Sequence, residues 1–109
     1  MEENKLFEQV KRKLNITWDD EDTKNRINEI IESAIPDLKY KLGITDEDFD
    51  FSVPGTENTL FKAYCLYEWN HVIDEFDDNY ANMIAQVQAK HEVANYSKET
   101  EESEESEEV

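Results

Sequence analysis

The sequence has few residues that interrupt secondary structure. Only two glycines and two prolines occur among its 109 residues. Because Gly and Pro are the strongest local markers of turns, Pro36, Gly43, Pro54 and Gly55 indicate where elements bend or end. No internal repeat is visible along the chain.

Cysteine and long apolar runs are also scarce. The single cysteine, Cys65, excludes an internal disulfide and any zinc site built from cysteines. Residues 1–10 carry four charged side chains and do not resemble a signal peptide. The densest apolar stretch, residues 60–69, contains Lys62 and Glu68 and is far too short to span a bilayer. We therefore expect a chain that is made and kept in a reducing cytoplasm, without a membrane partner.

The sequence also contains few basic residues. Eleven Lys and Arg stand against 28 Asp and Glu, which gives a formal charge of −17. Duplex DNA carries about one negative charge per 1.7 Å and is held by Lys and Arg. The composition therefore argues against a protein that grips nucleic acid, although an acidic surface can stand beside DNA without sticking to it.

Much of the acid is gathered at the C-terminus. Residues 97–109 contain seven Glu, one Lys and a single apolar residue, so they carry −6 of the net charge and leave −11 on residues 1–96. Such a segment cannot bury enough apolar surface to offset the entropy lost on ordering. We expect one helical domain over residues 1–95 and a disordered acidic tail over residues 96–109. A domain of this size buries only about 60% of its unfolded surface, so association with other chains would stabilise it.

Apolar residues at helical spacing predict a small bundle of about four helices. The first covers residues 4–14, and the second begins in the acidic run 19–22 and ends at Gly43. Pro36 lies inside the second helix and should kink it or divide it near Ala34.

The second half of the body completes this all-α fold. Residues 44–55 form a connector in which apolar and polar residues alternate over 49–53, so a short extended segment fits there. Thr56 is the expected N-cap of a third helix that runs to about Phe76. A fourth helix is expected to begin near Tyr80.

The third helix is apolar on almost every side. Eight of the ten residues from Leu60 to Trp69 are apolar or aromatic. Such a helix must be covered on nearly all sides, and few partner helices are available in so small a domain. We therefore expect this helix to reach a contact between subunits.

No set of residues completes a catalytic or metal-binding signature. Glu68 and His71 share a helix face, as two ligands of a di-iron bundle do, but the second copy of the pattern, Gln88 and His91, lacks its carboxylate. His71 with Asp74 resembles a base with an orienting carboxylate, yet no Ser or Cys nucleophile stands at a recognisable spacing. We expect a surface pair here, and no enzyme activity, cofactor or metal site.

Three further features have an ordinary explanation. Cys65 lies in the most apolar segment, where a buried and inert thiol is expected. The acidic run 46–50 lacks the Gly and the final Glu of a calcium loop, which leaves a solvated turn. Trp18 precedes the second helix, where it serves either as a docking anchor or as a staple that packs on the first turn.

Charge is unevenly distributed along the body. Most basic residues lie in the first 41 positions, including the cluster Lys11, Arg12 and Lys13, and the later part is acidic. Identical subunits arranged head to tail could use this asymmetry, because heterologous contacts pair two different faces. Ordinary salt pairing on helix surfaces explains it equally well.

Parts of the sequence resemble a known family. The run LNITWDDED at 14–22, followed by the helix that ends KLGI at 41–44, is similar to the opening of small head–tail connector proteins of tailed phages. The stretch LFKAYCLYEWN at 60–70, with DEF at 74–76 and NYANMI at 79–84, is similar to members from phages of Gram-positive bacteria. The similarity is one of apolar and turn positions and covers most of the chain before the acidic tail.

The resemblance implies a structural virion protein. Connector (adaptor) proteins of this family are helical bundles that form a ring of about a dozen subunits beneath the portal. The ring extends the DNA channel and offers a docking surface to a stopper or tail-completion protein. It acts after DNA packaging to retain the genome, and double-stranded DNA later passes through it without specific binding. The resemblance thus implies a protein of the head–tail interface, present in the host cytoplasm during assembly.

Charge and apolar excess together suggest which residues would contact a neighbouring subunit or the portal. The candidates are Lys11, Arg12, Lys13, Phe61, Tyr64, Tyr67, Trp69 and Tyr96. The acidic tail would become ordered on binding the portal or another partner. Two alternatives remain open: an acidic protein that mimics DNA, and an unrelated helical interaction or regulatory domain.

Overall fold

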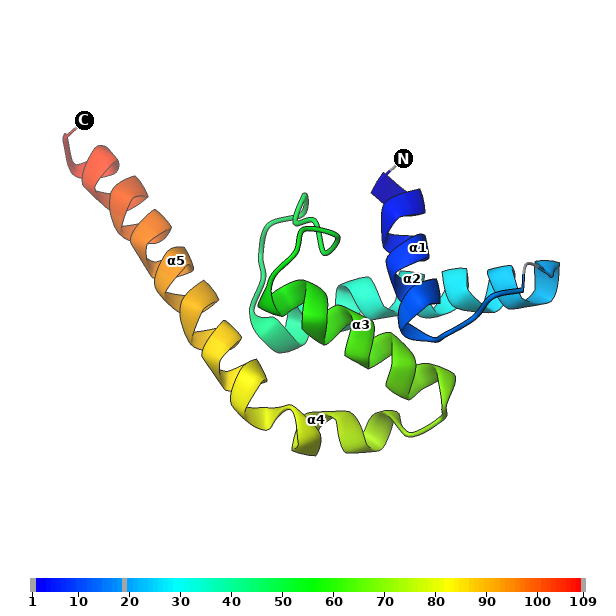
Figure 1. Ribbon diagram of the computed structural model, residues 1–109. Helices are drawn as coiled ribbons and strands as arrows, with labels where there is room; N and C mark the ends of the chain where they lie inside the picture. The colour runs from blue at the N-terminus through cyan, green and yellow to red at the C-terminus, as the bar shows by residue number, and fades with distance from the viewer. Residues whose placement is uncertain (1, 19, 109) are drawn as a thin grey trace.

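The computed structural model describes the backbone of residues 2–18 and 20–108 and the side chains of residues 5–18 and 20–96. This backbone holds five α-helices and one 3-10 helix and no strand, so the all-α prediction is confirmed and the expected number of about four helices is slightly low. In chain order they are α1 (Glu2–Lys13), α2 (Glu21–Leu42), α3 (Thr56–Trp69), η1 (Ile73–Glu75), α4 (Phe76–Asn79) and α5 (Ala81–Glu108) (Figure 1).

The second helix, α2, begins and ends where the sequence predicts. Asp20 is its N-cap: one carboxylate oxygen accepts the Thr23 hydroxyl at 2.7 Å and the other accepts the Thr23 backbone N–H at 3.1 Å. The hydroxyl and then the N–H hold the pKa of Asp20 below its ordinary value. At the other end Gly43 adopts a left-handed φ of 71°. Pro36 lies inside α2 without dividing it.

The apolar third helix, α3, is the centre of the core. It packs against α1, α2 and α5, and it lies between α1 and α5 in Figure 1. Buried apolar residues from the four other α-helices surround it, and Leu60, Phe61 and Cys65 of α3 have no exposed surface. The chain itself therefore covers the apolar excess of this helix, which removes the reason for expecting it at a subunit contact.

The third helix is shorter than the sequence predicts. It ends at Trp69 instead of continuing to Phe76. His71 takes a left-handed φ of 59°, and the chain turns there into η1 and α4. The turn places the fully buried ring of Phe76 against Tyr64 and Tyr80, at centroid distances of 5.3 and 5.2 Å. Burial of this ring compensates for the interrupted helix, and helical periodicity alone does not reveal it.

The connector between α2 and α3 is a series of turns. No strand forms in residues 44–55, so the expected extended segment is wrong. Phe51 and Ser52 are both buried, and the side chains therefore do not alternate between core and solvent as a strand requires. The N-cap of α3 is Gly55, one residue before the predicted Thr56.

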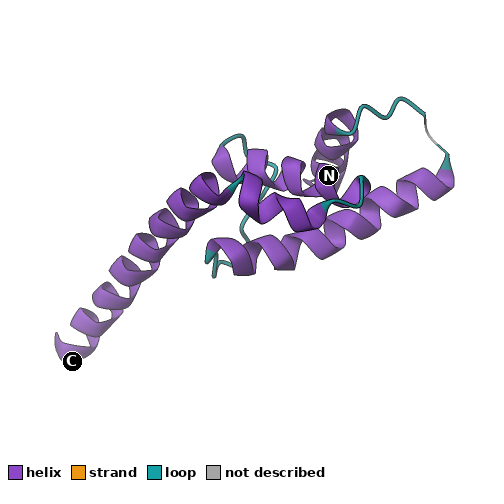
Figure 2. Cartoon of the chain, turned by 90° about the horizontal axis from the view of Figure 1, so that it is seen from below, coloured by secondary structure: helices purple, strands orange, loops and turns teal. Residues whose placement is uncertain are grey.

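The last helix, α5, projects from the body. It begins at Ala81, next to the predicted start at Tyr80, and its backbone is helical to Glu108. Its C-terminal part, red in Figure 1, stands away from the other helices, as Figure 2 also shows. The sequence predicted disorder from residue 96 onward, so the helical backbone departs from that expectation. The side chains of residues 97–108 lie outside the described residues.

Candidate functional site

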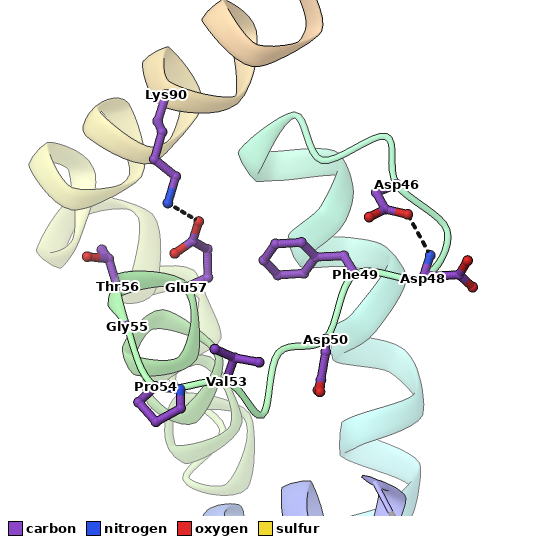
Figure 3. Close-up of a pocket in the computed structure, with 10 residues that line it drawn as sticks. All are labelled: Asp46, Asp48, Phe49, Asp50, Val53, Pro54, Gly55, Thr56, Glu57 and Lys90. Atoms are coloured by element: carbon purple, nitrogen blue, oxygen red, sulfur yellow. Dashed lines mark hydrogen bonds and ion pairs between the residues drawn. The ribbon is translucent and has the colours of Figure 1, made fainter. Parts of the chain in front are cut away.

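An open pocket lies where the connector, the start of α3 and the side of α5 meet (Figure 3). Its volume is about 560 Å³. Its lining mixes polar and apolar surface and comes from Asp46, Asp48, Phe49, Asp50, Val53, Pro54, Gly55, Thr56, Glu57 and Lys90. Four of these ten side chains are carboxylates, and three of them, those of Asp46, Asp50 and Glu57, make hydrogen bonds or ion pairs that hold the lining together.

Two connector carboxylates stabilise turns. Asp46 Oδ1 accepts the backbone N–H of Asp48 at 2.9 Å. Asp50 Oδ1 accepts the Ser52 hydroxyl at 2.6 Å and the Ser52 N–H at 2.9 Å, and these bonds, the hydroxyl's first, hold the pKa of Asp50 below its ordinary value. Side-chain oxygens that accept the N–H two residues on are typical of tight turns. The acidic run is therefore a hydrogen-bonded set of turns, as expected.

The third carboxylate joins two helices. Glu57, in the first turn of α3, is 9% exposed and binds Lys90 Nζ at 2.5 Å and His91 Nε2 at 2.9 Å, both from α5. The His91 ring stands edge-on to Phe49 at 5.7 Å. Burial raises the pKa of Glu57, but the hydrogen bonds from Lys90, its own backbone N–H and His91 together outweigh burial and leave that pKa below its ordinary value. Figure 3 shows Glu57 and Lys90 reaching toward each other across the pocket.

A second set of contacts ties α5 to the end of α2. Gln88 Nε2 donates to the Lys41 carbonyl at 2.7 Å, and Asn95 Nδ2 donates to the Gly43 carbonyl at 3.2 Å. The Thr45 hydroxyl donates to Asn95 Oδ1 at 3.1 Å. The last carbonyls of a helix have no partner within it, so these amides act as caps supplied by another helix. Gln88 and Asn95 stand seven residues apart on one face of α5.

We call these five α3 and α5 residues the α5 anchor: Glu57, Gln88, Lys90, His91 and Asn95. Together they hold α5 at two places along its length, and so they set the direction in which the helix leaves the body. Sequence reasoning missed this role. The signal available was the seven-residue spacing of two amides, which is weak because their partners are backbone carbonyls.

The predicted pair of Glu68 and His71 is not formed on a helix face. His71 lies outside α3, and its Nε2 faces Arg26 Nη2 at 3.2 Å. Because a guanidinium has no acceptor, the His71 nitrogen accepts this bond. Arg26 also donates to the Trp69 carbonyl at 2.7 Å and stacks 4.1 Å from the Trp69 ring centroid. The group holds the end of α3 to α2 and leaves His71 and Glu68 on different elements.

The other chemically interesting residues are also packed or paired. His91 belongs to the α5 anchor. Cys65 is buried, as predicted, and burial, followed by the charge of Glu68, raises the pKa of its thiol to about 12. Among the residues whose side chains are described, no group of three or more His, Cys, Asp or Glu is placed to hold a metal ion.

The structure separates the eight predicted interface residues into three groups: core residues, half-buried residues and residues near the surface. Phe61 and Tyr64 are core residues, so they offer no surface to a partner, and that part of the prediction is wrong. Tyr64 also donates its hydroxyl to Asp37 at 2.6 Å. Tyr67 and Trp69 are half-buried and pack against the core. Periodicity marks such residues as apolar, but it does not show which side of α3 the chain itself covers.

The remaining candidates lie near the surface at two separate places. Arg12 and Lys13 are exposed and Lys11 is half-buried, all in the last turn of α1. Tyr96, on α5, is 70% exposed. Trp18 is 51% exposed and donates its indole N–H to the Thr23 hydroxyl at 3.0 Å, which supports the staple and leaves half of the ring open.

Comparison with known proteins adds no family to these observations. No protein-family model, no curated protein and no solved structure matches the chain. Within the described residues, none of the helices combines the length and the apolar character that a membrane span requires.

Proposed function

We propose that this chain is a structural virion protein: a head–tail connector subunit that assembles into a ring under the phage portal. The ring would extend the DNA channel, help retain packaged DNA, and dock the stopper or tail. The observation that carries the proposal is the anchored, projecting α5. A helical body from which one long helix extends in a set direction can present two separate surfaces to two neighbours.

The geometry of α5 suits a subunit that contacts others. At 1.5 Å per residue its 28 residues extend about 42 Å, which exceeds what the small body can cover. The α5 anchor consists of four α5 side chains and one α3 carboxylate. These residues hold a helix whose described residues after Val87 contribute no buried apolar side chain to the core. Hydrogen bonds and ion pairs of this kind set direction more than they add stability.

Charge supports the same proposal. The formal charge of −17 disfavours adhesion to DNA, which suits a channel through which a genome must slide. The phage-like segment at 14–22 is the connection between α1 and α2 with the first two residues of α2, and the segment at 60–70 is most of the central helix α3 with the residue that follows it. The resemblance therefore lies in the parts that build the body.

The decisive experiment is assembly on the portal. The full chain would be purified alone and with the portal protein of the same genome, and both would be examined by native mass spectrometry and negative-stain imaging. A ring of this chain on the portal supports the proposal. A chain that ignores the portal and instead binds a DNA-processing enzyme would overturn it in favour of the acidic DNA mimic.

A further inference from the structure

The turn that ends α3 places a histidine where a helix usually places a glycine. His71 follows the C-cap Asn70 and has a left-handed φ of 59°. Its N–H donates to the Glu68 carbonyl at 3.1 Å. The Val72 N–H donates to the Tyr67 carbonyl at 2.9 Å, which closes the turn. We call residues 70–72 the α3 turn. Few residues with a side chain adopt such a φ, so the contacts of the imidazole affect how firmly the turn is held.

Arg26 of α2 decides which protonation state of His71 fits this turn. Its Nη2 lies 3.2 Å from His71 Nε2 and also donates to the Trp69 carbonyl at 2.7 Å. A guanidinium has only donors and stays charged at every ordinary pH. His71 Nε2 therefore accepts the bond and carries no hydrogen while the contact exists. A protonated imidazole has a hydrogen on both nitrogens and cannot accept.

No described carboxylate offsets a second positive charge at this place. The acidic residues nearest to Arg26 and His71 along α2, α3 and η1 are Asp22, Glu29, Glu68, Asp74 and Glu75. Within the described side chains, none of them bonds either basic group. The C-terminal end of a helix does favour one cation. Arg26 already supplies it, at the Trp69 carbonyl.

We propose that His71 is a proton-sensitive latch that holds the α3 turn to α2. The neutral imidazole accepts the Arg26 hydrogen bond and keeps the turn closed. Protonation sets two cations against each other, the bond is lost, and the turn loosens. Histidine changes its charge between pH 5 and 8, so the latch opens as the pH falls through this range. The latch is independent of the proposed connector function.

The opening should stay local. The Arg26 guanidinium lies 4.1 Å from the centroid of the Trp69 ring, and this stack does not need His71. The fully buried ring of Phe76 holds α4 in the core beyond the turn. Protonation should therefore loosen residues 70–75 and leave the rest of α3 as it is.

Hydrogen exchange of the full chain, followed by NMR and corrected for the intrinsic effect of pH, tests the latch. We expect the protection of amides in residues 70–75 to fall about fivefold from pH 8 to pH 5, which is the effect of losing one hydrogen bond. His71→Asn is the matched variant, because Asn tolerates the left-handed conformation and does not titrate. Its protection should be the same at both pH values. A wild type without the fall would overturn the proposal.

The second histidine provides a control. His91 belongs to the α5 anchor, with Glu57 at the opposite end of α3 from the turn. His91→Gln should keep the full response of residues 70–75 to pH. Loss of the response in His91→Gln, or its persistence in His71→Asn, would place the titrating group elsewhere and overturn the latch.

Arg26→Gln tests the cause. A glutamine amide can donate to a neutral imidazole through its nitrogen and accept from a protonated one through its oxygen. The variant should therefore lose the difference in protection between pH 8 and pH 5, while His71 remains able to titrate. A response as large as that of the wild type would show that the guanidinium is not responsible.

Discussion

The ring of Phe76 joins the aromatic residues of α3 to Tyr80, just before α5. Its ring is fully buried and contacts Tyr64, Tyr67 and Tyr80 at centroid distances of 5.3, 5.8 and 5.2 Å. Aromatic pairs at these distances add to the free energy of burial. The short helix α4 therefore serves to place one ring, and the break after Trp69 follows from that placement.

Phe61 provides the sharpest test of the core at the residue scale. Phe61→Ala should lower the free energy of unfolding by about 3–5 kcal/mol, because the variant leaves a cavity beside Phe51, whose ring centroid lies 4.9 Å away. Urea unfolding followed by circular dichroism measures the change. Tyr40→Ala, at a site that is 90% exposed, should stay within about 0.5 kcal/mol of the wild type. Stability unchanged by Phe61→Ala would return Phe61 to the list of interface residues.

Glu57 should make the folded chain less stable as the pH falls. Its pKa in the folded chain lies below the ordinary 4.5, so its ion pairs stabilise the fold above that value and are lost as the pH falls through the lowered pKa. Glu57→Gln should unfold at a lower temperature at pH 7 and lose less stability than the wild type when the pH is brought below 4.5. Thermal unfolding across this range gives both quantities. The exposed neighbour of the anchor, Glu92, supplies the control Glu92→Gln, whose profile should match the wild type.

At the scale of elements, the end of α2 is where three parts of the chain meet. Gly43 closes the helix in a left-handed conformation, and its N–H and that of Ile44 return to the carbonyls of Tyr40 and Lys39. The carbonyls of Lys41 and Gly43 are capped from α5. The termination of α2 and the placement of α5 are therefore one structural feature.

Gly43→Ala tests the cost of this termination. The new Cβ would meet nothing within 4 Å, so the whole cost is the left-handed φ of 71°, about 1–2 kcal/mol for a residue with a side chain. Gly43→Asn should cost less, because Asn tolerates this conformation. Chemical unfolding of the three proteins gives the order. An Ala variant as stable as the wild type would contradict the assigned backbone geometry.

Asn95→Ala tests the anchoring of α5. Loss of its hydrogen bonds to Gly43 and Thr45 should free the adjacent part of α5 at a cost of about 0.5–1.5 kcal/mol for each bond. Hydrogen exchange should become faster over residues 88–96 and stay unchanged in α3. The neighbouring exposed Glu92→Ala is the matched variant and should leave exchange in α5 as it is. Equal protection in both variants would show that Asn95 does not anchor α5.

The whole molecule is more extended than its length requires. Its radius of gyration is 16.5 Å, against about 13 Å for a compact domain of this size, and its principal extents are 59 × 32 × 19 Å. The projecting α5 accounts for the difference, as Figure 2 shows. Much of the α5 backbone thus stands apart from the other helices of the chain, which is the geometric basis of the assembly proposed above.

Deletion of residues 97–109 should separate folding from assembly. The segment contains only one apolar residue, so its removal should leave the unfolding temperature within about 2 °C of the full chain, while association of copies at low salt weakens. Differential scanning calorimetry and analytical ultracentrifugation measure the two effects. Unchanged association, or unchanged attachment to the portal, would remove support for a role of the acidic end.

The helical elements were predictable where one sequence feature decided each of them. The carboxylate of Asp20 can cap the N-terminus of a helix, and Gly43, which lacks a side chain, can take the left-handed conformation that ends one. The ends of α2 lie at these two residues. The interruption at His71 and the burial of Ser52 were not predictable in this way. Each depends on residues distant in sequence: the ring of Phe76 packs on Tyr64, and the Ser52 carbonyl accepts Gln9 Nε2 at 2.9 Å.

What the sequence by itself determined was the helical class, the ends of α2, the start of α5 and the excess of acid, because each of these depends on residue type and local spacing. Only the tertiary structure decided which apolar residues were left for a partner. The aromatic residues of α3 pack on side chains from other elements: Phe61 on Phe51, Tyr64 and Tyr67 on Phe76, and Trp69 on Arg26. Val93 and Tyr96, of which only Tyr96 had been predicted at an interface, remained exposed. Whether an apolar residue is buried depends on which side of its helix another helix covers. The packing of the whole fold determines this, and local sequence does not.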